Sequence, residues 1–285
     1  MTQLPPPKAL IDDAVARALA EDLGLAGDIT SAACIPASAH SRAVIAARRG
    51  GVVCGVDFAV AAFAQLDPRI DVAIRAPDGA AVASGALVLE IEGPTRGILG
   101  GERVALNFLC HLSGIATATA ALVAAAAGTG ARIACTRKTT PGLRAFEKHA
   151  VACGGGSSHR FGLFDAVMVK DNHIAACGGD VAAAVRQARA AIGHLIKVEV
   201  EIDRLDQLDP AIAAGADVIL LDNMSVADLA AAVKQTGGRA ILEASGNVTV
   251  DSVAAIARTG VDVISSGWIT HSAPILDLGL DFVHG

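Results

Sequence analysis

The chain contains no tyrosine, a single tryptophan, and six cysteines of which none forms a CxxC pair. A chain of 285 residues buries a sizeable core without covalent cross-links, so we expect reduced thiols, as in a cytoplasmic protein. The spacing of a structural zinc site is also missing. The N-terminus lacks the positive segment and apolar run of a signal peptide. Apolar stretches elsewhere are interrupted by glycine and charge, so we expect no membrane association.

Positive charge is also scarce, with 23 Lys and Arg against 29 Asp and Glu and a net charge of −6. An acidic chain argues against a general nucleic-acid binder. A local basic segment is therefore informative. Residues 136–160 contain five Lys or Arg and two His but one acid, Glu147. This segment predicts an anionic ligand.

The first part of the chain has a mixed pattern. Residues 8–23 show helical periodicity, and short β-rich runs lie between 42 and 96, separated by Gly, Pro and Asp. A long helical stretch then runs from 101 to about 127, with a break expected near Gly114.

The second part alternates strand-like and helical runs, which indicates parallel strands with right-handed crossovers. The helical patterns are clearest at 179–191, 203–214, 225–236 and 249–259. The strand-like runs are 131–136, 165–170, 196–201, 216–222, 239–245 and 261–267. Six runs favour a six-stranded or incomplete α/β barrel, although periodicity alone does not exclude a flat, doubly wound sheet.

Every one of these runs ends in polar or charged residues, which a barrel brings together at one mouth. Cations follow the first two runs, so we expect one side of the mouth to bind a carboxylate or phosphate. The expected cluster comprises Arg137, Lys138, His159, Arg160 and Lys170. A solvated basic face is the alternative, and it suits Arg144 and Lys148 better.

Acids and glycines end the later runs. Glu201 and Asp222 close successive runs and suit Mg²⁺ with a polyphosphate, a ribose hydroxyl, or a simple ion pair with a nearby lysine. The segments 245–247 (SGN) and 265–267 (SSG) lie where β/α barrels commonly hold a phosphate. His173 and His271 show no metal spacing, so we expect structural roles for them.

Several motifs resemble, in order, those of the quinolinate phosphoribosyltransferase family. The longest is TRKTTPGLRAFEKHAVACGGGSSHRFGLFDAVMVKDNHI (136–174). The others are EDLGLAGDIT (21–30), GERVALNFLCHLSGIAT (101–117), VEVEID (198–203), ILLDNM (219–224), LEASGN (242–247) and SSGWITHSAPILDLGLDF (265–282). Departures are small: His149 replaces a frequent tyrosine, Ser157-Ser158 lies in a variable stretch, and Trp268 replaces a smaller residue.

The resemblance implies an N-terminal α/β sandwich domain at 1–112, an incomplete six-stranded α/β barrel at 113–271, and a tail at 272–285 that packs back on the first domain. It also implies a reaction, in which quinolinate and phosphoribosyl pyrophosphate give nicotinate mononucleotide, CO₂ and pyrophosphate in NAD synthesis. Mg²⁺ is the implied cofactor, and the enzyme is expected in the cytoplasm.

Carried over residue by residue, the family motifs imply catalytic roles for Lys138, Glu201 and Asp222, and Mg²⁺ contacts for the two acids. The cations and Arg103 would face quinolinate, and Ser245, Gly246 and Gly267 would hold the 5′-phosphate. The full set of expected substrate contacts is Arg103, Thr136, Arg137, Lys138, His159, Arg160, Lys170, Glu201, Asp222, Ser245, Gly246, Asn247, Ser266 and Gly267.

Arg103 would enter the neighbouring subunit's site, which implies a homodimer with shared sites, or an assembly of such dimers. Two alternatives keep the fold. One is a related protein of molybdenum-transport operons, and the other is a binder of a phosphorylated metabolite without chemistry.

Overall fold

The structure is a computed structural model that describes residues 5–283. The chain forms two compact units. Unit 1 comprises Met1–Ala120, Ala145–Gly154 and Ala273–Gly285, and unit 2 comprises Ala121–Arg144 and Gly155–Ser272. Residues 1–4 of the expected N-terminal domain and 284–285 of the expected tail lie outside the described residues. The domain boundaries given by the sequence stay a prediction.

Unit 1 is built on a four-stranded antiparallel sheet in the order β12-β1-β5-β3. The strands are β1 (His40–Ala47), β3 (Asp71–Ile74), β5 (Leu87–Pro94) and β12 (Leu278–Phe282), and a separate short pair joins β2 (Gly51–Val52) to β4 (Ala81–Val82). Along β1 the buried side chains alternate with more exposed ones, as in a strand with one face on the core. β12 pairs with β1 from Ala43–Phe282 to Ala47–Leu278, so the last strand of the chain completes the sheet.

Helices of unit 1 are α1 (Lys8–Leu23), α2 (Ile29–Cys34), α3 (Val56–Leu66), most of α4 (Thr95–Ala125) and nearly all of α5 (Arg144–Cys153). Three phenylalanines join α3, α4 and α5. The Phe58 ring stacks on Phe108 with centroids 4.7 Å apart and meets Phe146 edge-on at 4.8 Å. Such pairs add to the energy of burial, so they anchor α5 in unit 1 although its neighbours in sequence belong to unit 2.

α4 is one continuous helix, so the break expected near Gly114 was wrong. A Cβ atom on Gly114 would lie 2.3 Å from the carbonyl oxygen of Pro274, which shows that this glycine allows a close backbone approach. By length and apolar composition α4 would suffice to cross a membrane, contrary to the sequence expectation. Half of its apolar window is buried inside the protein, as in a core helix.

Unit 2 is an open barrel of six parallel strands in the order β6-β11-β10-β9-β8-β7, which confirms the predicted fold. The strands are β6 (Arg132–Ala134), β7 (Val167–Val169), β8 (Val198–Ile202), β9 (Val218–Asp222), β10 (Ile241–Ser245) and β11 (Val263–Ser265). Within residues 5–283 the two end strands, β6 and β7, do not pair with each other, so the barrel is incomplete.

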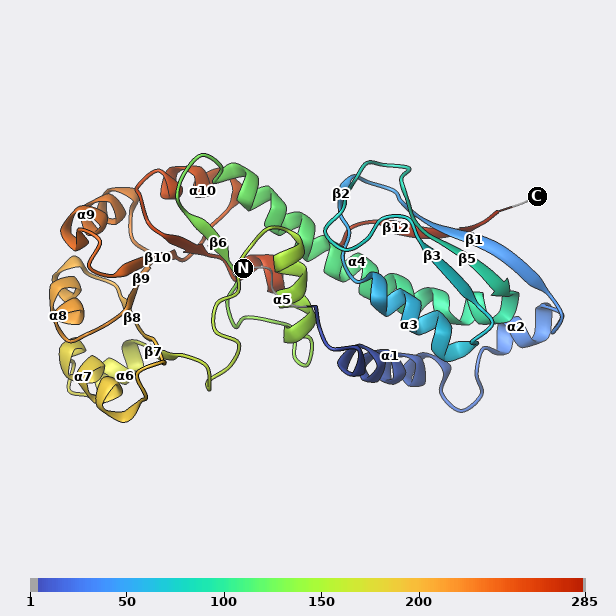
Figure 1. Cartoon of the computed structure of the whole chain (residues 1–285), viewed down its shortest axis with the longest axis horizontal. Helices are drawn as coiled ribbons and strands as arrows, with labels where there is room; N and C mark the ends of the chain where they lie inside the picture. The colour runs from blue at the N-terminus through green and yellow to red at the C-terminus, as the bar shows by residue number, and fades with distance from the viewer. Residues whose placement is uncertain (1–4, 284–285) are drawn as a thin grey trace. The chain divides into compact units, whose positions relative to one another are not determined.

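The helices of unit 2 follow the strands and lie along the outer side of the sheet (Figure 1). They are α6 (Asp171–Ala176), α7 (Val181–Ala191), the short 3₁₀ helix η1 (Leu205–Gln207) with α8 (Leu208–Ala213), α9 (Val226–Thr236), α10 (Val250–Ala257) and α11 (Trp268–His271). Asp180, Ser225 and Thr249 cap α7, α9 and α10 by accepting a backbone N–H bond in the first turn. These caps fix where each helix begins.

Candidate active site

A pocket of about 990 Å³ opens among the carboxyl ends of the unit 2 strands. Every site residue expected from the sequence lines this pocket except Arg103. These residues are Thr136, Arg137, Lys138, His159, Arg160, Lys170, Glu201, Asp222, Ser245, Gly246, Asn247, Ser266 and Gly267. The mouth of a β/α barrel is where side chains from separate strands converge.

Arginine and lysine form one part of the pocket lining. Arg137 and Lys138 follow β6, and Arg160 lies in the loop before β7; within residues 5–283 none of the three forms an ion pair with an acid. The buried Nε atoms of Arg137 and Arg160 have no hydrogen-bond partner in the part of the chain described. Burial, together with the charge of Arg137, lowers the pKa of Arg160. Two half-buried guanidinium groups that repel each other favour the binding of an anion.

A histidine lies beside these cations and faces two buried acids. His159 Nδ1 accepts a bond of 2.7 Å from the Arg160 backbone N–H, so Nε2 carries the ring proton and donates to Glu199 Oε2 at 2.9 Å. Glu243 Oε1 lies 3.7 Å from the same Nε2. Burial, reinforced by the charge of Glu199, raises the pKa of Glu243 to about 7. This group can therefore hold a proton near neutral pH.

Glu199 and Glu243 belong to the strand-like runs whose polar ends were expected to meet at the mouth, but neither was predicted to have a role in the site. A signal was present for Glu199. It lies two positions before Glu201 on β8, and alternate residues of a strand face the same side. For Glu243, burial at 4% exposure in the middle of β10 is a tertiary property that the strand pattern does not reveal.

The predicted metal-binding acids have different surroundings. Glu201, on β8, pairs with Lys170 through its Oε2, so the ion-pair alternative applies to this residue. Asp222, at the end of β9, accepts a bond of 2.9 Å from the Asn223 side-chain amide. Both carboxylates line the pocket, and together they offer the oxygen donors that Mg²⁺ prefers.

Two glycine-containing turns complete the lining. Gly246 has a φ of +103°, and a Cβ there would lie 2.1 Å from Asn223 Oδ1, so only glycine fits this turn after β10. Asn223 and Asn247 also adopt positive φ, at 52° and 48°. Such conformations in non-glycine residues collect at ligand sites. A Cβ on Gly267, after β11, would approach Lys138 Cδ to 2.9 Å.

The remaining predicted residues lie elsewhere or have local roles. Arg103 is exposed on α4 in unit 1 and is not part of the lining, so its role in a neighbouring subunit stays a prediction. His173 Nδ1 accepts a bond of 2.9 Å from the Lys170 backbone N–H at the start of α6, which is a structural role. His271 lines the pocket, with Nδ1 2.6 Å from Ser272 Oγ.

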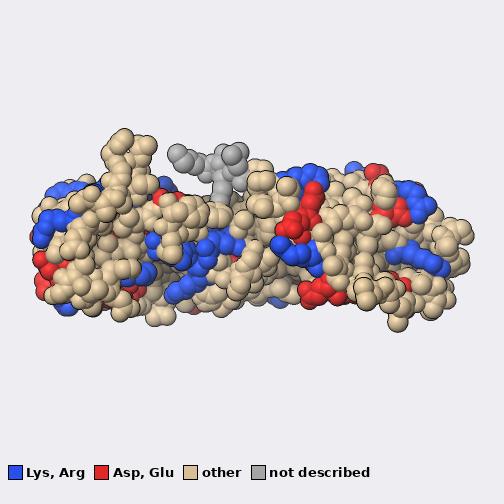
Figure 2. All heavy atoms as spheres, turned by 90° about the horizontal axis from the view of Figure 1, so that it is seen from below, with Lys and Arg blue, Asp and Glu red and all other residues tan. Residues whose placement is uncertain are grey.

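Figure 2 shows Lys and Arg side chains gathered over the barrel unit, in the left half of that view. The basic character is local, because the net charge of the chain is −6. Fold and pocket together define an α/β-barrel protein with a pocket at its mouth whose cationic lining suits small anionic molecules.

Comparison with known proteins names the family. The N-terminal domain model of quinolinate phosphoribosyl transferase matches residues 28–113, and the C-terminal domain model matches residues 115–281. The chain therefore belongs to the quinolinate phosphoribosyl transferase family, which is a family of phosphoribosyltransferase enzymes, and the recognition made from the motifs is confirmed.

Curated relatives and solved structures agree with this assignment. The nicotinate-nucleotide pyrophosphorylase [carboxylating] of Mycobacterium leprae is 45% identical over 94% of this chain and 96% of its own length. The human protein of the same name is 43% identical over 87% of this chain and 84% of its own. The structure of the nicotinate-nucleotide pyrophosphorylase from Francisella tularensis matches with a TM-score of 0.93 and 41% identity, covering 99% of this chain and 98% of that one.

Proposed function

We propose that this protein transfers the phosphoribosyl group of phosphoribosyl pyrophosphate to quinolinate, giving nicotinate mononucleotide, CO₂ and pyrophosphate in NAD synthesis. One observation carries the proposal. Arg137 and Arg160 line the pocket with buried Nε donors that have no acceptor among residues 5–283. Quinolinate has two adjacent carboxylates, which supply acceptors for such donors.

The pocket lining suits both halves of the reaction. The pyridine nitrogen attacks the anomeric carbon as pyrophosphate leaves, and this passes through an oxocarbenium-like state, as in glycosidic cleavage. Glu201 and Asp222 lie at neighbouring strand ends and can stabilise that positive charge. The turns at Ser245-Gly246-Asn247 and Ser266-Gly267 line the pocket and are the segments proposed to hold the 5′-phosphate.

Decarboxylation then breaks the bond between C2 and its carboxylate. The electron pair remains on the ring carbon beside the new pyridinium nitrogen, which stabilises it, and a proton takes the place of CO₂. Lys138, Arg137 and Arg160 hold the acid in place and stabilise the developing negative charge. No covalent nucleophile is needed for this reaction.

Mg²⁺ fits the donor set of this pocket, because Glu201 and Asp222 offer hard oxygen ligands near the turns proposed for the phosphates. When bound, Mg²⁺ would neutralise the charge that develops on the departing pyrophosphate. Asp222 would contact it more directly than Glu201, whose Oε2 is held by Lys170.

We propose further that the enzyme works as a homodimer in the cytoplasm, with Arg103 of one chain completing the other chain's site. The exposure of Arg103 on α4 and its absence from the pocket lining support this arrangement. The free state of the six cysteines supports a reducing compartment.

The experiment is an assay of pyrophosphate and CO₂ release with phosphoribosyl pyrophosphate and Mg²⁺. We expect release with quinolinate and none with nicotinate, which lacks the second carboxylate. Release with nicotinate would show that the two cationic donors do not select a dicarboxylate. Binding of both substrates without any release would favour the non-catalytic alternative.

A further inference from the structure

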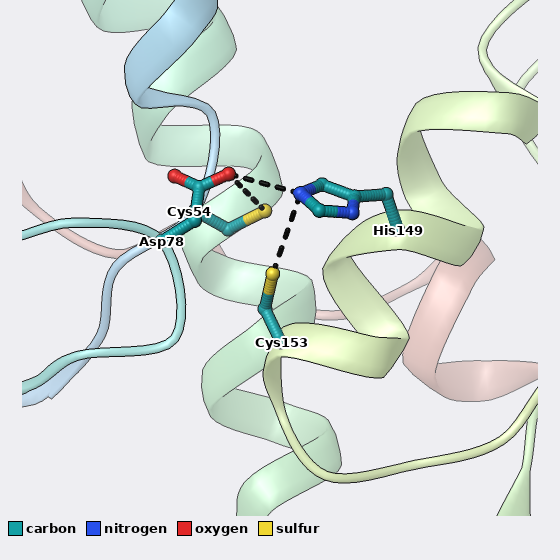
Figure 3. A group of neighbouring side chains, drawn as sticks. All are labelled: Cys54, Asp78, His149 and Cys153. Carbon is teal, nitrogen blue, oxygen red and sulfur yellow. Dashed lines mark hydrogen bonds and ion pairs between the residues drawn. The ribbon is translucent and has the colours of Figure 1, made fainter. Parts of the chain in front are cut away.

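A second group of reactive side chains lies in unit 1, whereas the pocket above is lined by unit 2. Cys54 precedes α3, Asp78 lies in the loop between β3 and β4, and His149 and Cys153 lie four positions apart on α5. In Figure 3 the side chains from these three segments point toward one another. Their ligand atoms all lie within 4.8 Å of one another.

Three of the six distances between the ligand atoms are close to those around a tetrahedral metal ion. His149 Nε2 lies 3.0 Å from Asp78 Oδ2 and 3.5 Å from Cys153 Sγ, and Cys54 Sγ lies 3.7 Å from Asp78 Oδ2. Zinc ligand bonds of about 2.0–2.3 Å place neighbouring ligand atoms roughly 3.3–3.8 Å apart. The cluster therefore needs only small shifts to surround one ion.

The geometry of the cluster is held by the protein. Asp78 Oδ1 accepts backbone N–H bonds of 2.9 Å from Gly55 and 3.0 Å from Val56 at the start of α3, which leaves Oδ2 directed at the other three side chains. Residues four apart on a helix share a face, so α5 presents His149 and Cys153 side by side. Bonds of this kind orient metal ligands.

Burial favours a site of the structural type. Cys54 is fully buried, and the side chains of His149 and Asp78 are 13% and 25% exposed.

We propose that Cys54, Asp78, His149 and Cys153 bind a zinc ion that fastens the 78–80 loop, the start of α3 and the end of α5 to one another. Two sulfurs, one imidazole and one carboxylate form a closed tetrahedral set, which is typical of structural zinc. Mg²⁺ and Ca²⁺ are disfavoured, because they select oxygen ligands. Zinc binding displaces the protons of the ligands.

A site of this kind has no CxxC pair by which it could be recognised in the sequence. The signal that was present is the His-x-x-x-Cys spacing at 149–153, which places two soft ligands on one helix face. The other two ligands come from loops far away in sequence, and only the fold brings them close.

The test measures zinc in the full-length protein, purified without chelator, by mass spectrometry of the metal. We expect one zinc per chain in the wild type. Cys54→Ala and Cys153→Ala should each bind zinc more weakly, by more than the about 10–100-fold that loss of an outer-shell partner costs. A competing chromophoric chelator gives the affinities. Asp78→Asn keeps the Oδ1 acceptor for Gly55 and Val56 and should lose affinity while folding normally.

Cys110→Ala is the matched control. Cys110 is also a half-buried cysteine of unit 1, but it lies on α4 outside the cluster. This variant should keep its zinc. A chelator should lower the melting temperature of the wild type and Cys110→Ala, and added zinc should restore it, whereas Cys153→Ala should not respond.

Three outcomes would overturn the proposal. The reduced wild type could take up no zinc on titration. Zinc could be retained equally by Cys54→Ala and Cys153→Ala, which would place the ion elsewhere. A disulfide between Cys54 and Cys153 in the protein as purified, with no zinc uptake after reduction, would assign the pair a different role.

Discussion

Replacing Arg160 tests whether its guanidinium binds the substrate or only supports the fold. Its Nε is buried without a partner in the part of the chain that the structure describes, and its Nη1 donates a bond of 3.2 Å to the Ala166 carbonyl. Arg160→Ala should fold normally and lower kcat/KM for quinolinate by about 10–150-fold, because a charge-assisted hydrogen bond contributes roughly 1.5–3 kcal/mol. Steady-state kinetics and a melting curve check this.

Arg186→Ala is the control for that variant. Arg186 lies on α7 with a side chain 61% exposed, and its partner Asp180 is 3.7 Å away. Its replacement should leave kcat/KM unchanged. Unaltered turnover and KM in a well-folded Arg160→Ala variant would remove Arg160 from the site.

The buried carboxyl of Glu243 makes the stability of the folded protein depend on pH. Its pKa is raised to about 7 by burial, so between about pH 4.5 and 7 the folded chain keeps a proton that the unfolded chain loses. Stability from this group is complete below pH 4.5 and falls as pH rises through that window, by an amount on the order of 3 kcal/mol.

Glu243→Gln, which carries no titratable proton, tests this sign. As pH rises from 5 to 7, the free energy of unfolding of this variant should increase relative to that of the wild type. Denaturant unfolding at several pH values measures the difference. A wild-type curve parallel to that of the variant would mean that the carboxyl is ionised throughout.

At the scale of elements, the six barrel strands were predictable because their apolar runs are covered on both sides and end in polar residues. α3 was missed for a physical reason. Six of its eleven residues are buried, including Phe58 and Phe63, so it lacks the continuous polar face that marks a surface helix. α6 and α11, of six and four residues, are too short for periodicity to show.

The site residues also divide into those that could be predicted from the sequence and those that could not. Strand ends can be read from sequence, so the lining around Arg137, Lys170 and Asp222 was predicted from the residues and the family motifs. The buried partnership of His159 with Glu199 could not be, because it depends on how strand β8 and the 155–160 loop meet in space. The cluster of Cys54, Asp78, His149 and Cys153 could not be predicted for the same reason, because only the fold brings its segments together.

Gly114 makes the packing of α4 testable. Gly114→Ala would place a Cβ 2.3 Å from the Pro274 carbonyl, and overpacking of this kind costs about 1–3 kcal/mol. We expect a melting temperature several degrees lower. Gly100→Ala, in the same helix, meets only Leu66 Cδ1 at 3.4 Å and should be neutral or stabilising. Equal melting temperatures for the two variants would show that the 274–275 backbone gives way.

At the scale of the whole molecule, the shared-site proposal predicts complementation. Arg103→Ala and Lys138→Ala homodimers should both be nearly inactive. In a mixed dimer one site would contain both substitutions and the other site would contain neither. With random assortment about half the dimers are mixed and half of their sites are intact, so roughly a quarter of wild-type activity should return.

Coexpression of differently tagged chains, with mass spectrometry of the isolated dimers, measures this. Mixed dimers without restored activity would show that Arg103 serves its own chain's site or none. Activity in the Arg103→Ala homodimer alone would show that this arginine is dispensable.

The pairing of β12 with β1 also bears on how the protein is made. Residues 278–282 leave the ribosome long after residues 43–47, whose edge partner they supply. During translation β1 therefore has an unpaired hydrogen-bonding edge while the whole barrel is synthesised. Exposed edges of this kind pair with strands of other chains. A chain that terminates before residue 278 should accordingly aggregate during biosynthesis, and the nascent chain should depend on chaperones until β12 emerges.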